Sequence, residues 1–92
     1  MIINNFKTPN DICKLIALNV RMHRRLRKLS LKSMSEKSGV SYGSLKRFES
    51  TGEIALKSLI KIAVVLDCAD EFEQLFARPV PQSIQEIIDG QL

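Results

Sequence analysis

The sequence contains few of the residue types that build metal centres, disulfide frameworks or cofactor sites. It has two cysteines and one histidine. Cys13 and Cys68 stand far apart and form no CxxC or CxxxH pair, and His23 lies in a basic run without a ligand partner at suitable spacing. We therefore expect no zinc site, no disulfide and no cofactor. Both cysteines are expected to be small, buried, reduced residues.

Long apolar runs are absent as well. No stretch approaches the roughly 20 residues that cross a bilayer. The N-terminus lacks the basic start and apolar core of a signal peptide. A chain of 92 residues, 45% hydrophobic and 26% charged, is typical of one globular domain. We expect a cytoplasmic protein.

Catalytic arrangements are also missing from the sequence. An enzyme needs an activated nucleophile, a metal cluster or paired carboxylates in a cleft. The chain has no glycine-rich phosphate loop and only one histidine, which lies among arginines. We expect no catalysis, and no small-molecule substrate is inferred.

The charges that are present are unevenly distributed. Residues 21–47 carry nine basic residues and one acidic residue, Glu36, and residues 67–92 carry six acidic residues and one basic residue, Arg78. The basic segment is expected to bind a polyanion, and the acidic segment is expected to face a different partner. Charge alone is equally compatible with an ordinary solvated surface. Binding to a membrane surface is disfavoured, because the basic residues are spread over several expected helices.

Helical periodicity and capping residues predict an all-α fold of five helices with a short additional C-terminal helix. In the first helix, Thr8 is a candidate N-cap, Pro9 suits the first position and Asp11 lies in the first turn. The expected helices span residues 9–28, 31–38, 42–50 and 56–66 and a short segment from residue 70. The fourth carries a stripe of Leu56, Leu59, Ile60, Ala63 and Leu66, and the fifth is expected to bury Phe72, Leu75 and Phe76.

The prolines at 79 and 81 divide the chain into a domain of residues 1–78 and a tail of residues 79–92. In the tail, Ser83 and Glu86 form a capping-box pattern. The final helix that they predict carries Ile84, Ile87 and Ile88 on one side.

Residues 30–49 have the pattern of two short helices joined by a tight turn. Met34 is expected to pack inward, Ser35 to allow close approach of the two helices, and Gly39 to form the turn. Val40 then fills the corner and Ser41 caps the next helix. On that helix, Leu45 and Phe48 fall on one side and are expected to be buried.

The opposite side of this helix carries Tyr42, Gly43, Lys46 and Arg47 and no acidic residue. Such a face can reach base edges in the major groove of double-stranded DNA. The helix N-termini at Ser30 and Ser41, together with Lys32 and Ser44, are candidates for phosphate contacts.

The segments Leu29–Ser41 and Tyr42–Glu49 (LSLKSMSEKSGVS and YGSLKRFE) resemble the Cro/C1-type, or xenobiotic-response-element, helix-turn-helix family. The resemblance extends from about Ile16 to Phe76. It implies a transcriptional regulator, here expected to be a repressor. It also implies a structural salt bridge between Arg24 and Glu49 that holds the recognition helix.

Several positions depart from the family pattern. Leu31 replaces a glutamine that contacts a phosphate, so this contact is missing, and Lys32 can substitute for it electrostatically. The loop after Glu49 is one residue longer than usual, which leaves the phosphate contacts there open. Gly43 costs about 1 kcal/mol relative to alanine. It either lets the backbone approach DNA closely or has no function.

The second half of the chain suggests a protein partner. Val64 and Val65 make the fourth helix apolar nearly all round, and Ile84, Ile87 and Ile88 add further apolar surface. We expect a homodimer that uses these residues, because such regulators read two half-sites. Alternatively, the tail helix folds back on its own domain. The residues from Phe48 to Leu59 also look like those of antitoxin-type regulators paired with Hip-type kinase toxins, which makes such a toxin an alternative partner.

Overall fold

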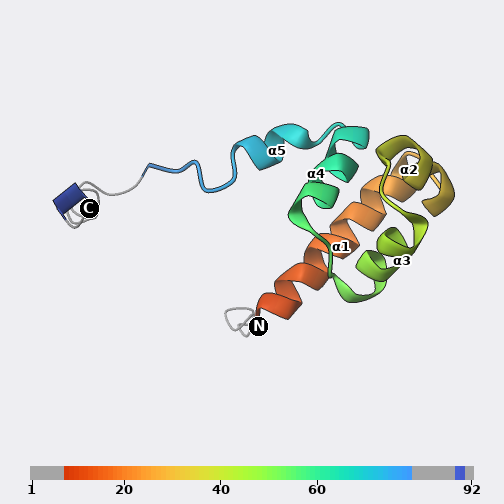
Figure 1. Cartoon of the computed structure of the whole chain (residues 1–92), viewed down its shortest axis with the longest axis horizontal. Helices are drawn as coiled ribbons and strands as arrows, with labels where there is room; N and C mark the ends of the chain where they lie inside the picture. Colours follow the sequence, from red (N-terminus) through yellow and green to blue (C-terminus); the bar gives the residue numbers. More distant parts are fainter. Residues whose placement is uncertain (1–7, 80–88, 91–92) are drawn as a thin grey trace.

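The computed structural model describes residues 8–79 and 89–90. It contains α1 (Pro9–Leu26), α2 (Leu31–Ser38), α3 (Tyr42–Thr51), α4 (Leu56–Val65) and α5 (Ala69–Glu73), and no strand among the described residues. The predicted all-helical fold is confirmed. Figure 1 shows α2 and α3 grouped at one end of the long α1, with α4 alongside and α5 beyond it. The expected tail helix, with Ile84, Ile87 and Ile88, lies outside the described residues.

Short capping signals set the helix ends as predicted. The hydroxyls of Thr8, Ser30 and Ser41 each accept a hydrogen bond from the backbone N–H three residues later, at 3.0–3.1 Å. Gly39 ends α2 in the left-handed conformation, with φ 78°. These bonds satisfy backbone N–H groups that have no partner within the helix. The two short helices therefore begin and end at fixed residues.

The first helix is shorter than predicted. It ends at Leu26 rather than at Lys28, because Lys28 takes a positive φ of 56° and turns the chain. The turn is closed by a hydrogen bond from the Leu29 N–H to the Arg24 carbonyl, at 3.1 Å. This bond brings the start of α2 back against the last turn of α1.

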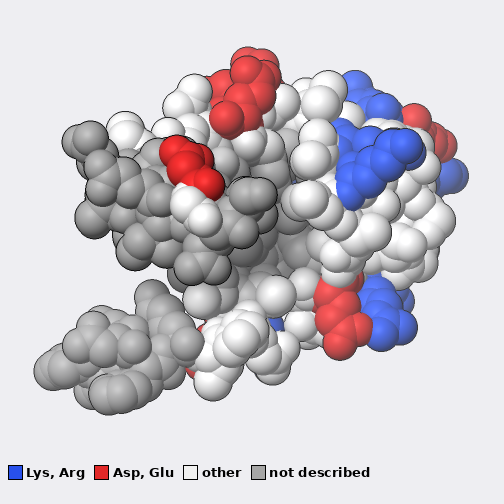
Figure 2. All heavy atoms as spheres, turned by 60° about the vertical axis from the view of Figure 1, so that its left-hand side comes forward, with Lys and Arg blue, Asp and Glu red and all other residues white. Residues whose placement is uncertain are grey.

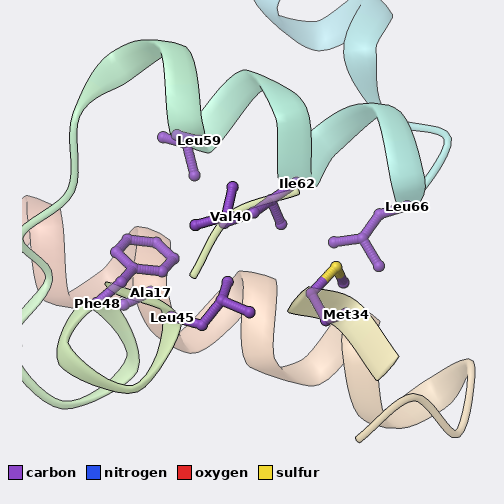
Figure 3. Close-up of a cluster of buried hydrophobic side chains, with 8 residues drawn as sticks. All are labelled: Ala17, Met34, Val40, Leu45, Phe48, Leu59, Ile62 and Leu66. Atoms are coloured by element: carbon purple, nitrogen blue, oxygen red, sulfur yellow. The ribbon is translucent and has the colours of Figure 1, made fainter. Parts of the chain in front are cut away.

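Side chains from four helices and the turn after α2 meet in a single core (Figure 3). The burial predicted for Met34, Val40, Leu45 and Phe48 is confirmed, since each is at most 4% exposed. The core members are Ala17, Met34, Val40, Leu45, Phe48, Leu59, Ile62 and Leu66.

The stripe predicted for α4 is partly wrong. Leu56 is 61% exposed, whereas Ile62, which does not belong to the predicted stripe, is completely buried. Leu56 is the first residue of α4, so it lies at the edge of the core rather than over it. Among the described residues, no helix is both long and apolar enough to cross a membrane.

The burial expected for the fifth helix is also wrong in part. Phe72 is partly buried against the core, but Leu75 is 54% exposed and Phe76 is 95% exposed. The helix ends at Glu73, and Phe76 takes a positive φ of 59° that turns the chain away. The two side chains therefore lie beyond the last helical turn that contacts α4.

The cysteines do not share one environment, contrary to expectation. Both are free thiols, but Cys13 is exposed and Cys68 is partly buried. Cys13 lies in the first half of α1, where the described neighbours do not cover its side chain. Burial raises the pKa of the Cys68 thiol, and the carboxylate of Glu71 raises it further.

The C-terminal end of α3 approaches the backbone of α1 more closely than a side chain allows. Gly52 ends α3 with φ 85° and donates a hydrogen bond to the Phe48 carbonyl at 2.7 Å. A Cβ atom at this position would lie 2.8 Å from the backbone carbon of Cys13 and 2.9 Å from the nitrogen of Lys14. Gly52 is therefore needed for its conformation and for its small size.

Three glycine-to-alanine substitutions should differ in their effects on the free energy of unfolding. At position 39, an added Cβ atom would have no other atom within 4 Å. Gly39→Ala should therefore lower the free energy of unfolding by only about 1–2 kcal/mol, the penalty of a left-handed residue. Gly52→Ala adds a steric clash with α1 and should cost clearly more. Gly43 lies inside α3 with open space around it. Gly43→Ala should therefore raise the free energy of unfolding by about 1 kcal/mol. Urea denaturation of the three variants measures these differences, and equal losses at positions 39 and 52 would contradict the close approach.

Candidate nucleic-acid interface

Hydrogen bonds from two serines fix the turn between α2 and α3. The Ser35 hydroxyl donates to the Val40 carbonyl at 2.7 Å. The Ser38 hydroxyl donates to the Met34 carbonyl at 2.6 Å and accepts from the Val40 N–H at 3.1 Å. With Val40 buried between the helices, these bonds hold α3 at one angle to α2. A fixed angle is what a helix needs to enter a groove in register.

The four residues predicted to read bases share the solvent-exposed face of α3. Tyr42, Gly43, Lys46 and Arg47 are all exposed. Leu45 and Phe48, on the opposite side, are 2% and 1% exposed and anchor the helix in the core. The outer face takes no part in the core, so its side chains are available to a ligand.

Arg47 is less free than the sequence suggests. Its Nη2 atom donates a hydrogen bond to Oε1 of Glu53, and this contact raises the pKa of the guanidinium. The two side chains are 68% and 62% exposed, so water screens their attraction and the pair is weak. Glu53 can orient Arg47 without preventing it from turning to another acceptor.

The residues predicted to contact phosphates lie near the start of each short helix. Ser30 and Ser41 use their hydroxyls as N-caps, and the Ser41 hydroxyl also donates to Ser44 at 2.8 Å. Lys32 is exposed on the first turn of α2. The Ser30 and Ser41 hydroxyls are already engaged as caps, so the helix N-termini, Lys32 and the exposed Ser44 are the groups best placed to contact an anion.

Sequence reasoning missed a hollow of about 270 Å³ between α3 and the start of α4. The hollow is lined by Ser44, Arg47, Glu53, Ile54, Ala55 and Ser58. Ala55 is the N-cap of α4 and supplies no side-chain hydrogen bond, so the first N–H groups of α4 have no capping side chain. The only arginine of the hollow, Arg47, is paired there with the carboxylate of Glu53. The signal in the sequence was an alanine where a capping residue is usual.

Arg24 and Glu49 form a buried ion pair that joins α1 to α3. Arg24 Nε donates to Glu49 Oε2 at 2.7 Å and Nη2 donates to Oε1 at 3.0 Å. Their side chains are 10% and 9% exposed. Nη1 of Arg24 also donates to the Leu29 carbonyl at 2.7 Å. A second arginine, Arg21, has its Nε 3.7 Å from Glu49 Oε1. One carboxylate therefore holds the last turns of α1 against α3.

The predicted interface residues of α4 have different environments. Val64 is 61% exposed, whereas Val65 is partly buried and packs against the core. Val64 is thus available to a partner, and Val65 contributes mainly to the domain itself.

The face shown in Figure 2 has its basic side chains gathered on the right-hand side of the view, where some acidic side chains adjoin them. Further acidic groups lie over the upper part of the same face, away from the basic ones. No group of three or more His, Cys, Asp or Glu residues in the described part of the chain could hold a metal ion.

Comparison with known families gives one match. The model of a family described as helix-turn-helix matches residues 20–72, which is more than half of the chain. The matched segment begins in the middle of α1 and ends in α5. No curated protein and no solved structure matches the chain.

A double-mutant cycle tests the coupling between Arg24 and Glu49. Glu49→Ala should cost about 3–5 kcal/mol of unfolding free energy, because it leaves the buried Arg24 guanidinium without its carboxylate. Arg24→Ala should cost less, because Arg21 remains beside Glu49. The double variant should be less destabilised than the sum, with a coupling energy above about 1 kcal/mol. Arg25→Ala, on the same helix at an exposed position, is the control and should change stability by less than about 0.5 kcal/mol. Additive losses would mean that the pair does not hold α3.

Proposed function

The chain belongs to the Cro/C1-type helix-turn-helix family of DNA-binding transcription regulators, and we propose that it represses transcription by inserting α3 into the major groove of a palindromic operator as a homodimer. The family is in general not enzymatic. The observation that carries the proposal is the outer face of α3, which is exposed and cationic on a helix fixed to the core by Leu45 and Phe48. A protein that occupies the groove in this way blocks access of other proteins to the same site.

Within this proposal, the residues of α3 have distinct roles. Arg47 and Lys46 donate to guanine edges, and Tyr42 contacts a base or a thymine methyl group. Gly43 adds no side chain between α3 and the groove. The N-termini at Ser30 and Ser41, with Lys32 and Ser44, contact phosphates and set the register. Glu53 holds Arg47 until a base acceptor replaces it.

A dimer follows from the way such domains read DNA. One recognition helix covers a few base pairs, and two of them on neighbouring turns of the duplex multiply the discrimination. Val64 on α4, together with Ile84, Ile87 and Ile88 of the tail, supplies apolar surface for this contact. Residues 1–78 then form the DNA-binding domain and residues 79–92 the assembly segment.

The second candidate is an antitoxin whose main task is to bind a protein such as a Hip-type kinase toxin, with DNA binding as autoregulation. The exposed apolar side chains of α1 favour it, because Ile12, Leu15 and Met22 are 45%, 43% and 60% exposed. Large apolar side chains in a group on a protein surface commonly mark a protein contact. The acidic residues after Asp67 would suit a basic partner.

Substitutions on α3 should separate base reading from charge attraction. Arg47→Ala or Lys46→Ala should cost about 1–3 kcal/mol at one base position and relax specificity there. Lys32→Ala should weaken binding to every sequence alike and reduce the salt slope by about one unit. Glu53→Gln should strengthen binding to all sequences, since it removes a negative charge and frees Arg47. Fluorescence anisotropy with fragments selected from random DNA, over a range of salt concentrations, measures both quantities.

The control for this experiment is Lys61→Ala, an exposed cation on α4 away from the helix-turn-helix. It should leave both affinity and sequence preference unchanged. Equal and sequence-independent losses from Arg47→Ala, Lys46→Ala and Lys32→Ala would show that α3 does not read the bases.

The antitoxin candidate predicts a stable complex with a purified Hip-type kinase. The complex should survive the Lys46→Ala, Arg47→Ala double substitution, because the apolar face of α1 is separate from the outer face of α3. Size-exclusion chromatography of the mixture measures complex formation. If the kinase and the full-length chain elute separately at micromolar concentration, this candidate fails and the repressor proposal is untouched.

A further inference from the structure

An open apolar groove of about 400 Å³ lies between α1, α4 and α5. Ile16 and Met22 line it from α1, Leu66 from the end of α4, and Phe72 and Leu75 from α5 and the turn after it. The groove lies on a different side of α1 from Ala17 and Arg24, which face inward, and no residue of α3 lines it. It is separate from the outer face of α3.

The rim of this groove exposes large apolar side chains to solvent. Ile16, Met22 and Leu75 are 38%, 60% and 54% exposed, and Ile12 and Leu15 continue the apolar face along α1. A contiguous face of this kind is unusual on a soluble protein unless a partner covers it. The groove therefore has the character of a binding surface.

Two of the rim residues lie outside the segment that matches the family. The match begins at residue 20 and ends at residue 72, so Ile16 precedes it and Leu75 follows it. The groove therefore extends beyond both ends of the matched segment.

The chain itself contains a segment that suits the groove. Ile84, Ile87 and Ile88 have the i, i+3, i+4 spacing of one helix face, and a helix with such a face binds in an apolar groove. Leu75 and Ser83 are eight residues apart, a stretch that spans at most about 29 Å when extended. The segment from 83 to 88 is therefore long enough to reach a groove close to its own domain or on a second copy.

The direction of the chain after α5 favours the second copy. The described residues from Gln74 to Pro79 run away from α1 and α4 in Figure 1. Pro79 and Pro81 fix φ at two positions and disfavour helix at the residue before each, which favours an extended connection. A segment that leaves in this direction reaches a neighbouring molecule more readily than its own groove.

We propose that the groove between α1, α4 and α5 receives residues 83–88 of a second copy of this chain, in a reciprocal exchange. The inference rests on the homodimer of the proposed function and specifies its contact. In a two-fold arrangement each tail fills the partner's groove, so both grooves are covered at once. The apolar face of α1, which the described residues leave in solvent, then becomes the centre of the interface.

Cysteine cross-linking tests which groove the tail occupies. Cys68 lines the groove and serves as a native reporter. In the Cys13→Ser, Ile87→Cys chain, mild oxidation should join the thiol introduced at position 87 of one copy to Cys68 of the other and give a disulfide-linked dimer on non-reducing gels. The oxidation is run at alkaline pH, because burial raises the pKa of the Cys68 thiol. The control is the Cys13→Ser, Lys61→Cys chain, whose new thiol lies at an exposed position of α4 that does not line the groove.

A charge placed in the groove tests the same contact without cysteines. Met22→Lys should weaken dimerisation at least about tenfold in sedimentation equilibrium of the full chain. It puts a charge where the proposed dimer buries an apolar side chain. Leu18→Lys is the matched control, since Leu18 is 51% exposed on the same helix but does not line the groove. It should leave the dimer intact. Both variants should still bind a single DNA half-site.

Each outcome is decisive. A disulfide within one molecule would place the tail in its own groove and overturn the proposal, as would a dimer that Met22→Lys does not weaken. That second result would leave the homodimer standing with another contact. A full-length chain that stays monomeric yet binds a half-site would overturn the homodimer and this inference together. Failure of the unmodified chain to bind any half-site would instead count against DNA reading by α3.

Discussion

The ion pair between Arg24 and Glu49 is the contact that fixes the recognition helix relative to the rest of the domain. A buried ion pair offsets the cost of desolvation only when its geometry is good and its remaining hydrogen bonds are satisfied. Here both carboxylate oxygens accept from one guanidinium, whose third nitrogen donates to the Leu29 carbonyl. These three hydrogen bonds can form together only when α3 has one position against α1. They also require the chain just before α2 to lie against the same arginine. The pair therefore acts on orientation more than on net stability.

The small residues around α3 have the same effect from other directions. Gly52 lets the end of α3 touch the α1 backbone, and Ser35 and Val40 hold its beginning against α2. α3 is thus restrained at both ends while Leu45 and Phe48 anchor its middle. In the proposed complex, the outer face of α3 would meet DNA already ordered, which would lower the entropy that binding costs. Rigidity of the helix and freedom of its outer side chains follow from the same packing.

Features that depend on a few neighbouring residues could be predicted from the sequence, and features that depend on distant ones could not. The N-caps at Ser30 and Ser41 and the turn at Gly39 follow from local chemistry, and so do the bounds of α2. The exposure of Phe76 depends on the turn that the chain makes after α5. No local pattern in the sequence indicates this turn. In α1, apolar residues occur around much of the helix, so periodicity alone could not show that Ala17 faces the core and Met22 faces solvent. The pairing of Arg47 with Glu53 was missed because it crosses the turn after α3.

The two surfaces of this domain lie on different elements, so the proposed DNA reading and the proposed assembly are compatible. The outer face of α3 takes no part in the groove, and the groove is formed by α1, α4 and α5. They are nevertheless connected, because Leu59 and Leu66 line the groove and also pack in the core that holds α3. A tight core transmits a displacement of α4 to its neighbours rather than absorbing it. A partner seated in the groove would therefore fix the spacing of two recognition helices while leaving the chemistry of each reading face unchanged.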